Sequence, residues 1–267
     1  MPVANLNNHA MYYELIGRGE PLLCMGGWGT YCHGNERSLA RGLTDHYQVV
    51  LFDYRGIGDS SDDLAEPPTM ALHAADAIAL LDHLAIKQAH LMGLVGMGAC
   101  ICQEIAIVRP DLARSMLNMG AWCDVDNFLR DQLEMLRWIH RESGFFAFQQ
   151  AVTLLSFTPE FYNANKLRLL GPNGGWKELK DRYATHSRLV DACVSFNSHD
   201  RLQQIRCPSL IIHAGLDQVT SPRVTRPIEA GIPGARGITW NDVAHVVAGR
   251  EQKIRFAETL FDWLAAN

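Results

Sequence analysis

The chain has 267 residues, of which 48% are hydrophobic and 20% are charged, an ordinary balance for a globular protein. The formal net charge of −5 argues against nucleic acid or an anionic membrane as a partner. The longest apolar run, Leu91–Cys102, is too short to span a bilayer. Seven irregularly spaced cysteines and a start without a signal-peptide pattern predict free thiols and a cytoplasmic protein.

Short apolar runs followed by turn residues predict a series of buried strands. The first three are Pro21–Met25, Gln48–Phe52 and Ala89–Val95. Met70–Leu84 lies between the last two and has apolar residues at helical spacing. An alternation of strand, helix and strand predicts a parallel sheet with right-handed crossovers. After Gly98 we expect a helix that ends before Pro110, and then a strand over Ser115–Met119.

The pattern changes between Trp122 and Leu202, where strand-like runs are absent and aromatic residues are frequent. Helical periodicity is present in this region, over Asn127–His140, Gly144–Ser156 and Trp176–Val194. Strands return at Pro208–Ala214 and Gly237–Trp240, and Ile254–Leu264 closes the chain as an amphipathic helix. The sequence therefore predicts an α/β protein with a mostly parallel central sheet flanked by helices. Residues 1–121 and 206–267 form the predicted core, and residues 122–205 form a helical cap.

Four segments outside this region resemble loops of the α/β-hydrolase family, in family order. VLFDYRGIGDS, residues 50–60, resembles the D-x-R-G-x-G-x-S turn. LLCMGGWGT, residues 22–30, resembles the H-G-x-G oxyanion loop, with Gly26 in place of the usual histidine. IIHAGLDQVTSP resembles the acid loop and NDVAHVVAGRE the histidine loop. The chain is thus similar to the small lactone, ester and carbon–carbon bond hydrolases, such as the 3-oxoadipate enol-lactone hydrolases.

The resemblance implies which residues form the active site. The acid loop places Asp217, and the histidine loop places His245, as the catalytic pair. Trp28 and the backbone N–H of Met97 would form the oxyanion hole. The resemblance implies a small-molecule substrate. We expect no cofactor and no metal site, because the sequence has no nucleotide loop and its histidines have no ligand spacing. The sequence gives no prediction of the oligomeric state.

The fifth family element, the G-x-S-x-G nucleophile elbow, departs from the pattern. Alignment from the upstream strand puts the serine position at Val95, whereas alignment from the downstream helix puts it at Gly96. The elbow therefore contains one extra residue, and neither candidate has a nucleophilic atom. We favour Gly96, since glycine adopts a positive φ more easily than a β-branched valine. The same run also resembles, over about ten residues, the elbow of the N-myc downstream-regulated family, which has this fold but lacks hydrolase activity.

Two functions follow from these residues. The first is an enzyme in which His245 and Asp217 act as a general acid/base on a small, partly apolar lactone, ester or β-diketone without a covalent intermediate. The second is a non-catalytic ligand-binding or scaffold protein that reuses the pocket. A third interpretation is a serine replaced by mutation to trap a substrate, but a point mutation would not shift the register of the elbow.

Overall fold

The computed structural model describes residues 2–28, 32, 39–62 and 64–267, and in these residues eight strands form one sheet. The strand order is β1-β2-β4-β3-β5-β6-β7-β8. Neighbouring strands are parallel from β4 to β8, whereas β2 is antiparallel to both β1 and β4. The strands are β1 Val3–Leu6, β2 His9–Gly17, β3 Glu20–Met25, β4 Tyr47–Phe52, β5 Ala89–Leu94, β6 Ala113–Met119, β7 Ser209–Ala214 and β8 Arg236–Trp240.

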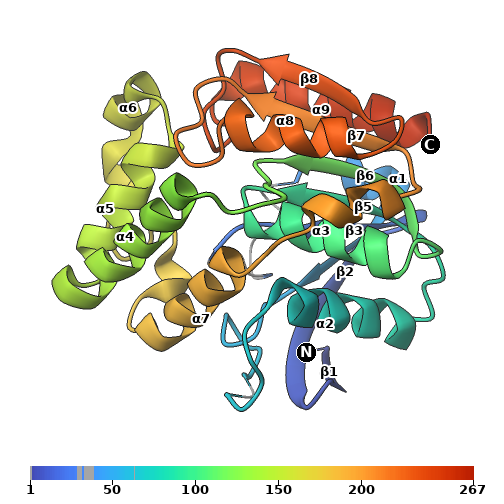
Figure 1. Cartoon of the computed structure of the whole chain (residues 1–267), viewed down its shortest axis with the longest axis horizontal. Helices are drawn as coiled ribbons and strands as arrows, with labels where there is room; N and C mark the ends of the chain where they lie inside the picture. The colour runs from blue at the N-terminus through green and yellow to red at the C-terminus, as the bar shows by residue number, and fades with distance from the viewer. Residues whose placement is uncertain (1, 29–31, 33–38, 63) are drawn as a thin grey trace.

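Helices cover both faces of the sheet (Figure 1). The helices α2 (Met70–His83), α3 (Met97–Val108) and α8 (Pro222–Gly231) contribute to one apolar core. The helices α1 (Leu43–His46) and α9 (Arg250–Ala265) contribute to the core on the other face. The predicted class, a mostly parallel sheet flanked by helices, is confirmed.

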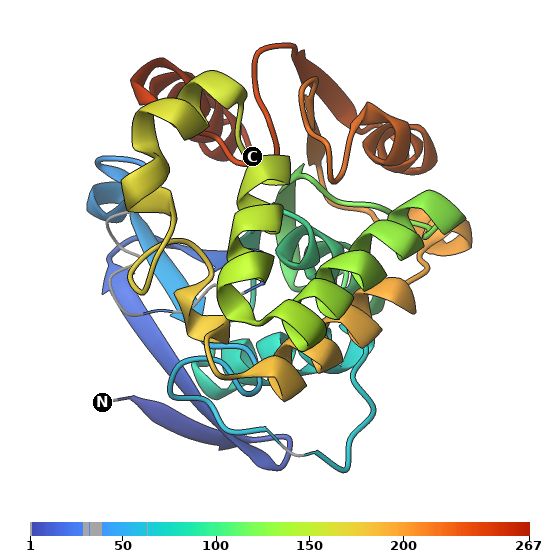
Figure 2. The same ribbon diagram turned by 90° about the vertical axis from the view of Figure 1, so that its left-hand side faces the viewer.

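Four helices lie between β6 and β7 in the chain. They lie outside the sheet layer, on one side of it (Figures 1 and 2). We call α4 to α7 the inserted helices. They are α4 Asn127–Ser143, α5 Phe145–Ser156, α6 Pro159–Leu169 and α7 Tyr183–Val194. Side-chain oxygens of Asp126 and Thr158 accept hydrogen bonds from the first turns of α4 and α6, which fixes where these helices begin. The division into a core and a cap of residues 122–205 stays a prediction.

Several elements differ from the sequence-based expectation. The hairpin of β1 and β2 was not expected, because polar residues interrupt its apolar alternation. The helix expected over residues 176–194 is broken into a 3₁₀ turn at Lys177–Leu179 and α7, because Asp181 has a left-handed backbone with φ of 59°. The helix α3 begins at Met97, two residues before the expected start. None of the helices in the described residues has the length and apolar character needed to cross a bilayer.

Buried hydrogen bonds hold the turn that follows β4. The carboxylate of Asp53 accepts from the backbone N–H of Cys32 at 2.6 Å and of Asp59 at 2.9 Å. Arg55 forms a buried, two-pronged ion pair with Asp76 of α2. These contacts give Asp53 and Arg55 a structural role in the turn.

The inserted helices contain a buried pair of imidazoles. The Nδ1 atoms of His140 in α4 and His186 in α7 lie 2.9 Å apart, so one of them donates to the other. Phe148 packs against both rings. Burial lowers the pKa of His140. Burial, followed by the positive charges of His140 and Arg137, lowers the pKa of His186 to about 3. The pair is therefore neutral near neutral pH.

This neutral pair predicts a loss of stability in mild acid. The pKa of His186 in the folded protein lies below the ordinary value. The contribution of this neutral imidazole to the free energy of unfolding is therefore complete above about pH 6.5 and declines as the pH falls toward 3. Urea unfolding would be measured between pH 7.0 and 4.0. The free energy of unfolding of His186→Phe should depend less steeply on pH than that of the wild type, by up to about 1.4 kcal/mol per pH unit. Leu129→Ala, a buried packing control near the start of α4, should lower stability without changing this slope. Identical slopes for His186→Phe and the wild type would contradict the prediction.

Candidate functional site: a histidine–aspartate pair beneath the inserted helices

The structure brings His245 and Asp217 together, as the sequence predicted. Asp217 follows β7, His245 follows β8, and these strands are neighbours in the sheet. His245 Nδ1 lies 2.9 Å from Asp217 Oδ2. Both residues are buried. With Nδ1–H donated to the carboxylate, Nε2 carries the lone pair of a neutral imidazole and is able to accept a proton.

The carboxylate of Asp217 accepts four hydrogen bonds. The backbone N–H groups of Val219 and Thr220 each donate to Oδ1 at 2.7 Å. The Thr220 hydroxyl donates to Oδ2 at 2.8 Å, beside the bond from His245. Burial alone would raise the pKa of Asp217, but the charge and hydrogen bond of His245 and the donors from Thr220 together lower it. The aspartate is therefore ionised and oriented toward the imidazole.

Thr220 was not among the residues that the sequence singled out. Its hydroxyl oxygen is also 3.1 Å from His245 Nδ1, so it contacts both members of the pair. Its side chain is completely buried. A threonine three residues after an aspartate is common in turns, so only the folded loop distinguishes this hydroxyl from an ordinary one.

Backbone hydrogen bonds hold the two loops side by side. The N–H of Gly215 donates to Trp240 O at 2.8 Å, and the N–H of Leu216 donates to Val243 O at 2.9 Å. The N–H of Val246, next to the histidine, donates to Ser156 O of α5 at 3.1 Å. The histidine loop is thus fixed both to the acid loop and to the inserted helices.

The turn between β5 and α3 contains both candidate nucleophile positions. β5 ends at Leu94 and α3 begins at Met97, which leaves Val95 and Gly96 in the turn. Both have a positive φ, of 51° for Val95 and 81° for Gly96. We expected the glycine to adopt this geometry more easily than the valine, but the valine adopts it too, at a strain cost of about 1–3 kcal/mol.

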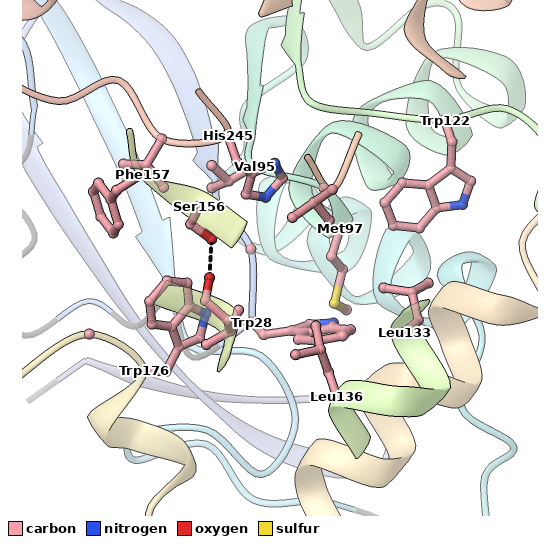
Figure 3. Close-up of a pocket in the computed structure, with 16 residues that line it drawn as sticks. Trp28, Val95, Met97, Trp122, Leu133, Leu136, Ser156, Phe157, Trp176 and His245 are labelled. Atoms are coloured by element: carbon pink, nitrogen blue, oxygen red, sulfur yellow. Dashed lines mark hydrogen bonds between the residues drawn. The ribbon is translucent and has the colours of Figure 1, made fainter. Parts of the chain in front are cut away.

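Trp122 stands beside Gly96. A Cβ atom at Gly96 would lie 3.3 Å from Cζ3 of Trp122, which is the nearest of its neighbouring atoms. The Cβ atom of any side chain at position 96 would therefore contact this indole. Figure 3 places His245 and Val95 on one side of Met97, and Trp122 on its other side. Val95, Gly96 and His245 all line the same cavity, and neither turn residue supplies a nucleophilic atom.

The two residues proposed for an oxyanion hole also line this cavity. Met97 is the first residue of α3, where a backbone N–H has no partner within the helix and the helix dipole is positive. The Trp28 indole N–H donates to Cys193 Sγ of α7 at 3.2 Å, and its ring lies edge-on to His186 at 4.9 Å. The loop of Trp28 is therefore attached to an inserted helix.

The cavity has a volume of about 370 Å³ and lies between the sheet and the inserted helices. Its wall contains no Lys, Arg, Asp or Glu among the described residues, and His245 is its one titratable side chain there. Aliphatic and aromatic side chains form most of it (Figure 3). The inserted helices and the loop after α6 contribute Leu133, Leu136, Val152, Ser156, Phe157, Gly175 and Trp176.

The cysteines near the elbow do not belong to this cavity. Cys100 is fully buried in α3, and its thiol lies 3.5 Å from Trp122 O. Burial raises the pKa of Cys100 well above its ordinary value, which disfavours the reactive thiolate. A displaced cysteine nucleophile is therefore not supported by this geometry.

The contacts of Thr220 predict the effect of removing its hydroxyl. Thr220→Val keeps the shape but leaves the Asp217 carboxylate one donor short, so the pKa of Asp217 should rise and stability at pH 7 should fall by about 1 kcal/mol. Carboxyl ¹³C NMR titration and urea unfolding would measure both effects. Thr220→Ser should restore the wild-type values. If Thr220→Val titrates like the wild type, the hydroxyl does not hold this carboxylate.

Known proteins support this assignment of the fold. A family model described as the alpha/beta hydrolase fold matches residues 20–249. The chain is 29% identical over 236 residues to "Putative carbamate hydrolase RutD" of Azorhizobium caulinodans, covering 88% of each chain. It is 28% identical over 254 residues to "Putative non-heme bromoperoxidase BpoC" of Mycobacterium tuberculosis, covering 88% of this chain and 90% of that one.

A solved structure has the same fold. The enol-lactonase from Burkholderia xenovorans LB400 superposes with a TM-score of 0.85 at 21% identity, over 99% of this chain and 100% of the other. At this identity the similarity establishes the fold alone. The family model covers most of the chain, and the mostly parallel eight-stranded sheet agrees with it. The chain therefore belongs to the alpha/beta hydrolase fold family.

Proposed function

We propose that this protein is an enzyme that acts on a small, uncharged carbonyl compound through acid/base chemistry of His245 and Asp217, without a covalent intermediate. The observation that carries the proposal is the buried pair at the wall of an apolar cavity, in which the Asp217 carboxylate accepts four hydrogen bonds. A buried ionised carboxylate is costly unless it is paired and hydrogen-bonded. Such a pair facing a cavity is a candidate for catalysis.

The composition of the elbow supports a route through water. With valine and glycine in the turn, no side chain there can form an acyl-enzyme. His245 Nε2 would instead take a proton from a water molecule as that water attacks the carbonyl carbon. The carbonyl oxygen becomes an oxyanion, which the backbone N–H of Met97 and the loop of Trp28 would stabilise. The imidazolium would then return the proton to the leaving group, and Asp217 would hold the ring in the required tautomer. With a β-diketone, His245 would instead remove an acidic carbon-bound proton.

The wall of the cavity favours an uncharged substrate. A carboxylate or ammonium group would lose its hydration there, and no charged residue among those lining the cavity would replace it. An ester, a lactone or a β-diketone meets this requirement. The name of the Azorhizobium relative adds the carbamate, which contains a carbonyl group, and an uncharged carbamate would meet the same requirement.

A non-catalytic ligand-binding protein is the second candidate. It is favoured by the two turn residues that lack a nucleophilic atom and by the indole of Trp122 beside Gly96. In that case the aspartate and histidine would serve only to hold the two loops.

Turnover by variants of the pair tests the proposal. The wild type, His245→Ala and Asp217→Asn would be incubated with neutral esters, lactones, carbamates and β-diketones, and depletion followed by mass spectrometry. We expect His245→Ala to lose at least about 100-fold in rate, the lower range for general acid/base catalysis. His46→Ala, in α1 and outside the cavity wall, is the matched control and should retain the wild-type rate.

Intact-protein mass spectrometry tests the absence of a covalent intermediate. The wild type should show no acyl adduct during turnover and no labelling by a fluorophosphonate, which modifies activated serines. A stoichiometric adduct would contradict the proposed route. Equal ligand binding by the wild type and His245→Ala, with no compound consumed by either, would favour the second candidate.

A further inference from the structure

The loop of residues 170–176, between α6 and the 3₁₀ turn, forms part of the cavity wall through Gly175 and Trp176. Trp176 is half-buried and packs against the apolar core. Its backbone is left-handed, with φ of 57° and ψ of 14°. A tryptophan in this region is strained by about 1 kcal/mol or more, so contacts elsewhere must hold it there.

A single buried side chain supplies those contacts. Gln149 of α5 is 1% exposed, and its Nε2 donates to Gly175 O at 2.7 Å and to Gly171 O at 3.0 Å. Its Oε1 accepts from the N–H of Gly171 at 2.9 Å. The two ends of the loop, at Gly171 and Gly175, are thus clamped by one amide.

The packing of the loop leaves little freedom around this clamp. A Cβ atom at Gly174 would lie 2.3 Å from Leu169 O and 2.9 Å from Gln149 Nε2, so the loop backbone passes directly over the amide. The N–H of Gly175 also donates to Leu169 O at 3.0 Å. These contacts fix the position from which the Trp176 ring projects. In Figure 3, Trp176 and Phe157 lie on the opposite side of the view from Trp122 and Leu133.

The choice of an amide at position 149 is itself informative. Burying an amide costs free energy unless it is hydrogen-bonded, and an apolar residue would serve if α5 needed only packing. All three hydrogen bonds of this amide go to the loop that carries Trp176. The geometry therefore links Gln149 to the shape of the cavity.

We infer that Trp176 is a specificity-determining residue that limits the size of the uncharged ligand, and that Gln149 is the positioning residue that holds it in place. The ligand class rests on the proposed function, but the size limit does not. In Gln149→Leu, the carbonyl of Gly175 and the N–H of Gly171 lose their partner. Gly171 O keeps only its bond from the N–H of Gly174, so the loop that carries the ring of Trp176 is less firmly held. In Trp176→Gly, the ring is removed and the backbone strain is relieved, because glycine tolerates a positive φ.

Binding of a bulky neutral probe tests the inference without any turnover. The probe is N-phenyl-1-naphthylamine, titrated by fluorescence, and acetophenone, a small neutral ketone with no ester bond to hydrolyse, is the size control in competition. Both Gln149→Leu and Trp176→Gly should bind the bulky probe at least about tenfold more tightly than the wild type, a gain of about 1.4 kcal/mol. Affinity for acetophenone should change less than this. Gln150→Leu, the exposed neighbour in α5, is the matched control and should bind like the wild type.

Near-UV circular dichroism and thermal melting would establish that each variant is folded. Trp176→Gly keeps Gln149 and its hydrogen bonds, so it tests the size limit even if Gln149→Leu fails to fold. Folded variants that bind the bulky probe within about twofold of the wild type would overturn the inference. A lack of turnover by the wild type would count against the proposed function alone, since the probe experiment measures only binding.

Discussion

The close approach of backbones at the elbow is the constraint on which the site depends. A Cβ atom at Gly93 would lie 2.4 Å from Cα of Ala99, and one at Gly98 would lie 2.4 Å from Met25 O. The start of α3 is therefore pressed against both β5 and β3, at contacts that only glycine allows. This packing places the N-terminus of α3 at the cavity wall. The two residues between β5 and α3, Val95 and Gly96, both have a positive φ.

The site combines a buried histidine–aspartate pair with an elbow turn whose residues, Val95 and Gly96, have no nucleophilic atom. The Asp217 carboxylate accepts donors from its own loop and from His245, so it is satisfied without any contact to the elbow. The pair can therefore keep its geometry when the residue opposite it changes. This independence is the physical reason why an intact dyad and a turn without a nucleophile coexist in one structure.

The inserted helices do more than cover the site, because they also hold its loops in place. They hold the histidine loop through the bond from Val246 to Ser156, and they hold Trp28 through Cys193 and His186. Gln149 and the loop of Trp176 belong to the same region. These contacts involve the loops of Trp28 and His245 and one wall of the cavity. Substitutions in the inserted helices can therefore alter the site without changing His245 or Asp217 themselves.

The sequence by itself determined the fold class, and it singled out Asp217 and His245 as the candidate acid–base pair. Apolar runs of strand length alternating with a helical pattern specify a parallel sheet, and Asp217 and His245 each follow a predicted strand, so both fall at the same sheet edge. It also identified Trp28, Met97, Val95 and Gly96, which all prove to line one cavity. Only the tertiary structure decided the rest. The roles of Thr220 and Gln149 depend on distances between loops that no local pattern encodes. The conformation of Val95 likewise came from packing, because the fixed positions of β5 and α3 overrode the preference of a β-branched residue for negative φ.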